Sequence, residues 1–482
     1  MGTIQIKDVS FRYDQMATDL FSKINLKIDE SWKLGLIGRN GRGKTTLLKM
    51  IMGQLNFSGE IISNLNFYYY PQTVVDKNVP TVEVVKNLAH LEDYDFWKIE
   101  IELEKLQLNA DILQRKFSNL SPGEQTKVLL AILFLDESGF QLLDEPTNHL
   151  DVEGRKTVAK YLKSKKGFIV ISHDKSFLNP VINHVISIDR NEISVYKGNF
   201  DTWQQQKSYQ DERELSQKRQ LQKDINRLKI TANERRNWAL ESEVNPDSTA
   251  RKMMKKAQHV LKRIDKSVSE KQSLLKNIEI EGPLKFNYQE LKYPKVLLKV
   301  VDLSLKKGEI VVPKVDFKIE VNQVISLMGP NGIGKSSIVK NILGLSHFFE
   351  QSGNIQLSKG LKVSYLRQDN ELQGTIRQLA EQKQIEPELI FSNLRKLGFE
   401  RYLFEQPIEQ MSQGQRRKVA LAISLSEEAN LYFWDEPLNY LDVITRQQII
   451  EAIKKQHPTM LLIDHDQDLI DAVSSAKVYL HY

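Results

Sequence analysis

Apolar residues recur at alternating spacings of three and four along residues 201–280. The first run is Leu221, Ile225, Leu228 and Ala232, and the second is Met254, Ala257, Leu261, Ile264 and Val268. Such a seam is typical of two helices packed along one another. Between the runs, residues 243–249 contain a proline with Asn, Asp and Ser, which end a helix and turn the chain. The pattern predicts an antiparallel helical hairpin, whose first helix, Asp201 to Glu243, would be roughly 60 Å long at about 1.5 Å per residue.

Outside this stretch, short apolar runs typical of buried strands lead directly into polar motifs. Residues 33–37 run into Gly38-Arg-Asn-Gly-Arg-Gly-Lys-Thr45, which has the pattern G-x-x-x-x-G-K-[ST] of a phosphate-binding loop. The glycines let backbone N–H groups curl around phosphate oxygens, Lys44 adds a positive charge, and the Thr45 hydroxyl is suited to Mg²⁺. A helix that begins near Lys44 would add its positive dipole end.

The same loop pattern returns as Gly329–Ser336, and Lys335 follows Lys44 by 291 residues. Three further motifs recur at this distance or one residue more: Leu120–Gln125 as Met411–Arg416, Leu142–Asp151 as Phe433–Asp442, and Ser172–Asp174 as Asp464–Asp466. Four paired motifs in one order predict a tandem duplication with the hairpin as its spacer. We therefore expect an α/β fold with two P-loop ATPase domains, at 1–200 and 281–482, joined by the linker 201–280.

Polar residues at the ends of apolar strands supply the remaining chemistry. Asp144 follows the apolar run 140–143, where an acid can hold Mg²⁺ at the end of a strand. Glu145, the next residue, can orient or deprotonate an attacking water. His173 follows another apolar strand and can contact a γ-phosphate. A lone histidine of this kind is more often structural, but its repetition as His465 favours a role in phosphoryl transfer to water.

Composition and charge change the interpretation only around the hairpin. The chain has no cysteine and no run near the ~18 apolar residues that a membrane helix needs, as expected of a cytoplasmic protein. Residues 201–280 contain 18 Lys and Arg against 12 Asp and Glu, a net charge of +6. Seven of these basic residues fall between Arg251 and Lys266 with a single acid. Such a run is either a solvated helix face or a surface for nucleic-acid phosphates.

The loops, the paired acids and the motifs Leu120-Ser-Pro-Gly-Glu-Gln125 and Met411-Ser-Gln-Gly-Gln-Arg416 resemble the ATP-binding cassette family over essentially the whole chain. In that family two cassettes pair head to tail, and each ATP with its Mg²⁺ lies between the loop of one cassette and the signature motif of the other. The resemblance implies an ATPase with two such composite sites within one chain, acting as a monomer with no membrane subunit.

The resemblance assigns the site residues by position. The first site would bind ATP through Tyr13, Gly38, Asn40, Gly41, Gly43, Lys44, Thr45, Thr46, Ser412 and Gly414, hold Mg²⁺ through Thr45, Gln72 and Asp144, and use Glu145 and His173 in catalysis. The second site would bind ATP through Gly329, Asn331, Gly332, Gly334, Lys335, Ser336, Ser337, Ser121 and Gly123, hold Mg²⁺ through Ser336, Gln368 and Asp435, and use Glu436 and His465.

The two halves depart from the family pattern in different ways. Pro122 stands where the signature often has a glycine, but Gly123 remains, so ATP contact should survive. The position that corresponds to Tyr13, which would stack on adenine, falls near Lys306-Lys307 in the second half, and Asp464 replaces the usual serine before the switch histidine. We therefore expect the two sites to hydrolyse ATP at different rates.

Two fused cassettes with a long linker, entered through Tyr196-Lys-Gly-Asn-Phe200, resemble the ABC-F subfamily. Within it, the segment Trp32–Lys44, the absence of an arm subdomain in the first cassette and the long tip resemble the Lsa-type antibiotic-resistance proteins. This resemblance implies a ribosome protection protein that acts from the E site of the bacterial ribosome, contacts 23S rRNA and P-site tRNA, and points its linker tip (236–252) toward the peptidyl-transferase centre. The implied drugs are lincosamides, pleuromutilins and streptogramin A. The tip residues suited to these contacts are Arg235, Arg236, Trp238, Leu240, Arg251, Lys252, Lys255 and Lys256.

Other interpretations of the same sequence stay open at this point. A housekeeping translation factor would have the same build, and the ATPase subunit of a membrane transporter would share the cassettes but has no use for a basic hairpin. Trp238 and Leu240 could also pack the end of the hairpin instead of contacting RNA.

Overall fold

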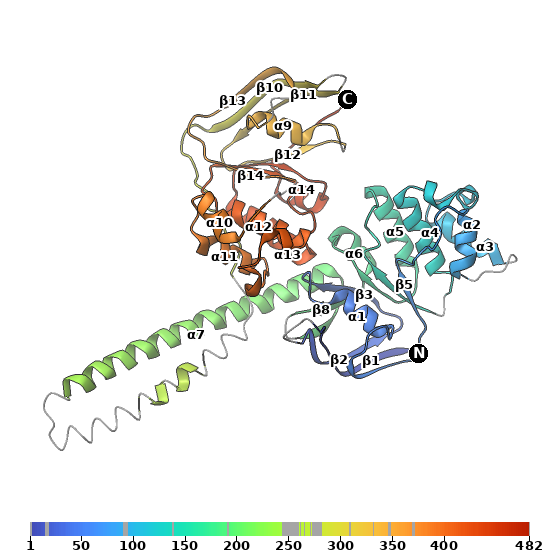
Figure 1. Cartoon of the computed structure of the whole chain (residues 1–482), viewed down its shortest axis with the longest axis horizontal. Helices are drawn as coiled ribbons and strands as arrows, with labels where there is room; N and C mark the ends of the chain where they lie inside the picture. Colours follow the sequence, from blue (N-terminus) through green and yellow to red (C-terminus); the bar gives the residue numbers. More distant parts are fainter. Residues whose placement is uncertain are drawn as a thin grey trace. The chain divides into compact units, whose positions relative to one another are not determined.

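The computed structural model describes residues 2–14, 19–89, 95–136, 139–189, 192–242, 260, 262–264, 266–269, 271, 282–307, 310–330, 332–345, 349–368 and 372–481. The chain divides into two compact units (Figure 1). One consists of Met1–Asp201 together with Pro283–Tyr482 and contains both cassettes. The other is Thr202–Gly282 and contains the linker.

The first cassette combines a parallel sheet, a small antiparallel sheet and a group of helices. Its elements are β1 (Thr3–Phe11), β2 (Phe21–Asp29), β3 (Lys33–Gly38), α1 (Lys44–Ile51), β4 (Ser58–Ser63), β5 (Phe67–Tyr70), α2 (Thr81–Ala89), α3 (Phe96–Lys105), η2 (Ala110–Gln114), η3 (Phe117–Asn119), α4 (Pro122–Leu133), β6 (Phe140–Asp144), α5 (Val152–Ser164), β7 (Phe168–Ile171), α6 (Lys175–Val181), β8 (His184–Ile188) and β9 (Ile193–Lys197). The main sheet has the strand order β5-β6-β7-β3-β8-β9, in which only β9 is antiparallel to its neighbour, and the small sheet has the order β2-β1-β4.

The second cassette repeats this plan. Its elements are β10 (Val296–Lys307), β11 (Ile310–Glu320), β12 (Val324–Met328), α9 (Lys335–Ile342), β13 (Glu350–Leu357), β14 (Val363–Leu366), α10 (Ile376–Gln382), α11 (Pro387–Lys396), η4 (Arg401–Leu403), η5 (Ile408–Gln410), α12 (Gln413–Ser426), β15 (Leu431–Asp435), α13 (Val443–Gln456), β16 (Met460–Ile463), α14 (Gln467–Val473) and β17 (Ala476–Tyr479). The order β14-β15-β16-β12-β17 matches the first five strands of the other sheet. The predicted fold class, two tandem α/β P-loop domains, is confirmed.

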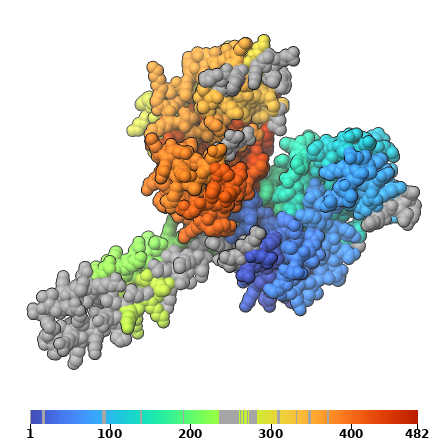
Figure 2. All heavy atoms as spheres, viewed as in Figure 1, coloured from blue at the N-terminus to red at the C-terminus, as the bar shows by residue number. Residues whose placement is uncertain are grey.

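Both faces of each main sheet are covered, which explains why its strands are almost entirely apolar. In β15, Tyr432 and Trp434 pack into the core shared with helices α10–α12, while Phe433 points to the opposite core beneath β10 and β11. The space-filling view shows the first cassette, coloured blue to cyan, as one continuous body (Figure 2). Alternating burial on a two-faced sheet is the expected result of a strand's period of two.

The linker begins with α7 (Phe200–Ser242), a helix of 43 residues. Ile225, Ala232 and Ile264, three residues of the predicted seam, are buried, and Lys271 donates a hydrogen bond to Asp224 at 2.7 Å. The described residues between 260 and 271 are helical. The first helix of the expected hairpin is therefore present, but the turn lies outside the described residues, and the complete hairpin stays a prediction. No helix among the residues described is long and apolar enough to cross a membrane.

Replacement of Trp434 by Ala should lower the free energy of unfolding of the second cassette by about 3–5 kcal/mol, because the indole is buried between helices and sheet. Urea unfolding followed by far-UV circular dichroism measures this change. Tyr402→Ala, which removes a ring that is 74% exposed, is the control and should change the value by less than about 0.5 kcal/mol. Equal effects of the two substitutions would contradict the assignment of Trp434 to the core.

Candidate functional site: two phosphate-binding loops and their partners

Each predicted phosphate-binding loop joins the carboxyl end of a central parallel strand to the start of a helix. Gly38 ends β3 and Lys44 begins α1, while Met328 ends β12 and Lys335 begins α9. Gly43 and Gly334 have φ values of 86° and 106°, and a Cβ atom there would lie 2.7 Å from Phe21 and 2.5 Å from Val312. Glycine is therefore required by both conformation and space. The helix N-terminus and the loop N–H groups form an anion-binding arrangement.

The loop lysines fold back over their own loops. Lys44 Nζ donates to the carbonyl oxygen of Gly38 at 2.8 Å, and Lys335 Nζ donates to Gly329 and Pro330 at 2.8 and 3.0 Å. Burial lowers the pKa of both lysines, and nearby carboxylates oppose that shift. The loops thus hold a buried ammonium group beside the backbone that would cradle a phosphate.

The hydroxyl and carboxylate predicted to hold Mg²⁺ meet in the first cassette. Thr45 Oγ1 donates to Asp144 Oδ2 at 2.7 Å, and Tyr69 donates to the same oxygen at 3.0 Å. Gln72 donates its amide to Leu129, and its buried Oε1 has no hydrogen-bond partner among the described residues. A hydroxyl, a carboxylate and a free amide oxygen are hard ligands of the kind that Mg²⁺ prefers, so these residues fit the ion.

The second cassette arranges the same residue types differently. Both carboxylate oxygens of Asp435 are buried and have no hydrogen-bond partner among the described residues, and this burial raises the pKa of Asp435. Gln368, however, donates its amide to Glu436 Oε2 at 2.8 Å. Across the described parts of the chain, no group of three or more His, Cys, Asp or Glu side chains could hold a metal ion.

The predicted catalytic acids follow the metal-binding acids directly. Both have left-handed backbone conformations, with φ of 55° at Glu145 and 49° at Glu436, and both donate their N–H to the neighbouring strand. Glu145 lies 3.2 Å from His173 and Glu436 lies 3.8 Å from His465, measured between carboxylate oxygen and Nε2. The structure therefore brings each predicted pair together.

Burial controls the protonation of these groups. It raises the pKa of Glu145 to about 7, although Lys44 opposes the shift, and it lowers the pKa of His173 to about 3. Burial also lowers the pKa of His465. Each histidine is therefore neutral near pH 7, and Glu145 is poised to accept a proton from water.

The signature motifs form helix N-termini. Ser121 caps α4 and Ser412 caps α12, and each forms a reciprocal capping box with the residue three positions later. Pro122 occupies the first turn of α4, where proline is tolerated, so this departure from the family pattern leaves the helix start intact. A hollow beside α4 is lined by Ser121, Pro122, Gly123, Glu124, Lys127, His149, Leu150, Asp151 and Gly154.

The first phosphate-binding loop is hydrogen-bonded to Tyr440 and Asp442, which lie beside Gly414 of the second signature motif, within the unit that contains both cassettes. The Asn40 backbone N–H donates to Asp442 Oδ2 at 3.2 Å, and its side chain donates to the Tyr440 carbonyl at 3.3 Å. A Cβ atom on Gly414 would lie 3.7 Å from the Asn40 amide. Between the described residues of Gly329–Ser336 and either Ser121 or Gly123, no hydrogen bond is found.

Other predicted residues have simpler positions. Tyr13 is 42% exposed, and its hydroxyl lies 3.0 Å from that of Thr46 in α1, which places its ring beside the loop. Ser337 lies in the first turn of α9. Arg235, Arg236, Trp238 and Leu240 lie on α7, but their side chains are outside the described part of the structure, as are Asn331, Arg251, Lys252, Lys255 and Lys256 entirely.

Sequence reasoning missed Tyr69 and Arg417. Tyr69 is the middle residue of a Tyr-Tyr-Tyr strand, where alternation would have placed it on the opposite face from its neighbours. Arg417 lies just beyond the signature motif and had no sequence signal of its own.

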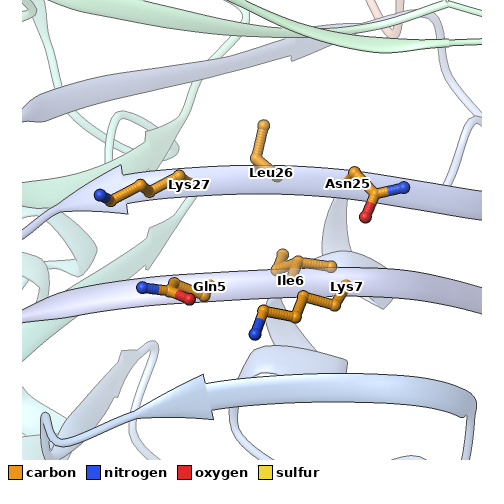
Figure 3. A pocket seen from close by; sticks show the side chains of 6 residues that line it. All are labelled: Gln5, Ile6, Lys7, Asn25, Leu26 and Lys27. Carbon is orange, nitrogen blue, oxygen red and sulfur yellow. The ribbon is translucent and has the colours of Figure 1, made fainter.

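A shallow hollow on β1 and β2 does not share this chemistry (Figure 3). Ile6 and Leu26, which pair across the two strands, belong to the core, and the exposed Lys7, Asn25 and Lys27 surround them. The hollow has no carboxylate and no glycine-rich turn among its lining residues. Nucleotide chemistry is therefore assigned to the two loops.

Fold and site together define a tandem P-loop nucleotide-binding protein. A family model described as ABC transporter matches residues 21–148 and 312–439, and a second model with the same description matches residues 186–281. The chain belongs to the ATP-binding cassette family, and its two cassettes with an extension between them are those of the ABC-F subfamily.

Relatives and solved structures cover almost the whole chain. The ribosome protection protein VmlR of Bacillus subtilis is 27% identical over 97% of this chain and 85% of its own length. The probable ATP-binding protein YheS of Escherichia coli K12 is 26% identical over 96% of this chain and 76% of its own. The archaeal ribosome recycling factor aABCE1, solved with the stalk protein aP1, aligns with a TM-score of 0.59 at 20% identity, covering 98% and 89% of the two chains, and supports the fold.

The kcat/KM of ATP hydrolysis should fall as the pH decreases from 8 to 6, because Glu145 must be ionised to accept a proton and its pKa is raised to about 7. An ATPase assay across this range measures the change, which should approach tenfold per pH unit below about pH 6.5 for this site. Glu145→Gln should remove this acidic limb. A profile that is flat between pH 6 and 8 would contradict the assignment.

Proposed function

We propose that this protein is an ATPase in which each nucleotide lies between the loop of one cassette and the signature of the other. The contacts of Asn40 with Tyr440 and Asp442, beside Gly414, support this for the first site. Glu145 and Glu436 would act as bases, with His173 and His465 at the γ-phosphate, and the Thr45–Asp144 and Ser336–Asp435 pairs would hold Mg²⁺. When bound, Mg²⁺ would neutralise charge on the transferring phosphoryl group.

We further propose that ATP controls binding of the protein to the bacterial ribosome. The observation that carries this proposal is the linker: α7 has 43 residues, about 65 Å at 1.5 Å per residue, and the linker has a net charge of +6. A helix of this length is longer than a folded domain needs for its own core, and a basic surface suits rRNA phosphates. The names of two similar proteins, a ribosome protection protein and a ribosome recycling factor, agree with this partner. Action on ribosomes places the protein in the cytoplasm.

Within this class we favour ribosome protection against lincosamides, pleuromutilins and streptogramin A. The protein would act as a monomer from the E site, with its linker tip directed toward the peptidyl-transferase centre and P-site tRNA. The similarity to VmlR over 97% of the chain supports this choice. A housekeeping translation factor is the second candidate, because YheS, named only as a probable ATP-binding protein, is similar over nearly the same length.

Protein carrying both Glu145→Gln and Glu436→Gln should co-sediment with bacterial ribosomes when ATP is present, because it would bind ATP without hydrolysing it. The variant with Lys44→Ala and Lys335→Ala is the matched control and should stay in the supernatant, since each substitution removes a loop ammonium group. Failure of the Glu→Gln variant to sediment with ATP would exclude the ribosome as the partner.

Purified protein with ATP should restore cell-free translation inhibited by a lincosamide or a pleuromutilin. Trp238→Ala with Leu240→Ala should abolish most of this rescue while the ATPase rate changes less than about twofold, because base and tRNA contacts are expected to depend on the tip. Tyr209→Ala with Ile230→Ala, two exposed apolar residues elsewhere on α7, is the matched control and should retain rescue. Ribosome binding without rescue would favour the housekeeping factor.

A further inference from the structure

Arg417 joins three parts of the second cassette. It lies on α12, five residues after Ser412, and is 3% exposed. Its guanidinium donates to four main-chain carbonyls, a use of its fixed fork of donors that lysine cannot reproduce. The acceptors are Arg367 at 2.6 Å from Nη1, Asp435 at 2.7 Å and Glu436 from Nη2, and Pro437 at 3.3 Å from Nε.

Two of these carbonyls belong to residues that would perform the chemistry, Asp435 and Glu436, and the other two belong to residues adjacent to Glu436 or to Gln368. Arg367 precedes Gln368, whose amide donates to Glu436, and Asp435 and Glu436 are the proposed metal ligand and base. Glu436 has a φ of 49°, a conformation that costs energy for any residue except glycine and persists only where the surroundings impose it. A buried arginine on both flanking carbonyls is a direct means of imposing it.

The first cassette has no equivalent residue. The position 291 residues earlier is Thr126, whose hydroxyl lies 3.3 Å from the hydroxyl of Tyr70 and is too short to span four carbonyls. A second position also differs between the cassettes. Ser172 of the first cassette, whose hydroxyl lies 2.8 Å from that of Thr147, corresponds to Asp464 of the second. Asp464 is buried and accepts hydrogen bonds from the N–H groups of His465 and Asp466 at 2.7 and 2.8 Å. The positions of two neutral residues of the first cassette, Thr126 and Ser172, are thus occupied in the second cassette by a cation and a carboxylate.

The two charges influence each other. Burial lowers the pKa of Arg417 to about 10, and Asp464 is the strongest of the carboxylates that oppose this shift. Burial raises the pKa of Asp464 to about 6. Arg417 could therefore serve only to balance the charge of Asp464. If so, a lysine at position 417, or the removal of both charges together, would restore function. If Arg417 positions the main chain, neither change would restore it.

We propose that Arg417 is a positioning residue of the second ATP site: it fixes the main chain of Glu436 and of the Gln368 segment against the signature helix α12. The role rests on the ATP hydrolysis proposed above. Because α12 also carries Ser412, which is proposed to complete the first site, Arg417 connects the signature of one site to the base of the other. Among the described residues, a connection of this kind through an arginine is found in the second cassette alone, so the two sites differ in how the main chain of the proposed base is held.

The test compares kcat, KM and the melting temperature of four variants of the full chain. All variants carry Glu145→Gln, which leaves hydrolysis to the second site. In this background Arg417→Thr and Arg417→Lys should lower kcat of ATP hydrolysis by about tenfold or more while KM changes less than about twofold, because the base is displaced and nucleotide contacts remain. Arg417→Thr with Asp464→Ser restores the neutral pair of the first cassette. Arg417→Thr alone leaves Asp464 without its neighbouring cation and should lower the melting temperature. The double variant should recover the melting temperature but not kcat. Arg377→Gln, which removes an exposed arginine that pairs with Glu405 on the same helical layer, is the control and should match the Glu145→Gln parent.

Each other outcome overturns the proposal. A kcat in Arg417→Thr equal to that of the Glu145→Gln parent, or its recovery in Arg417→Lys or in the double variant, would show that charge balance is the only role. Failure of all three Arg417 variants to fold would assign Arg417 to stability. Absence of ATP hydrolysis by the wild type would overturn the proposed enzymatic function itself. This outcome is distinguishable from failure of the present proposal because it is seen before any variant is compared.

Discussion

The parallel pairing of the central strands is the constraint on which the site depends. β6 and β7 are in register so that Asp144 lies opposite Ile171, and the N–H of Glu145 then donates to the Ile171 carbonyl at 2.9 Å. Since β3 and β7 are also parallel, the loop after β3, the acids after β6 and the histidine after β7 emerge at one edge of the sheet. The second sheet repeats this with Asp435 opposite Ile463. Strand register therefore brings residues together that are more than a hundred positions apart in the chain.

The two cassettes share a fold but differ in the polar contacts around their acids. Asp144 receives hydrogen bonds from Thr45 and Tyr69, and Gln72 leaves an oxygen free for an ion. In the second cassette Gln368 instead bonds to Glu436, and Arg417 takes up the carbonyls on either side of it. A buried arginine is tolerated there because carbonyls and carboxylates surround it.

The linker follows different physical rules from the cassettes. Ile225, Ala232 and Ile264 form a narrow buried seam, Trp203 is buried near the start of α7, and most of the other described side chains of the linker are exposed and polar. A helix with so thin an apolar stripe is stabilised mainly by packing against its partner helix. Ion pairs such as Lys271 with Asp224 add to this, but each contributes little because it is exposed to water. The properties of the linker that suit it to bind a partner are therefore its length and its positive charge, because it has no large apolar core of its own.

The sequence by itself determined the duplication, the two phosphate-binding loops, the paired acids and the first linker helix, because each is a local pattern: a glycine spacing, an acid after an apolar strand, or a repeat of three and four. It also predicted that the halves differ, from residues such as Asp464. Only the tertiary structure decided that Tyr69 reaches Asp144, that Gln368 turns to Glu436, and that Arg417 bonds to four carbonyls. These contacts depend on strand register and on how a helix packs over a sheet, and neither is encoded in any single stretch of the chain.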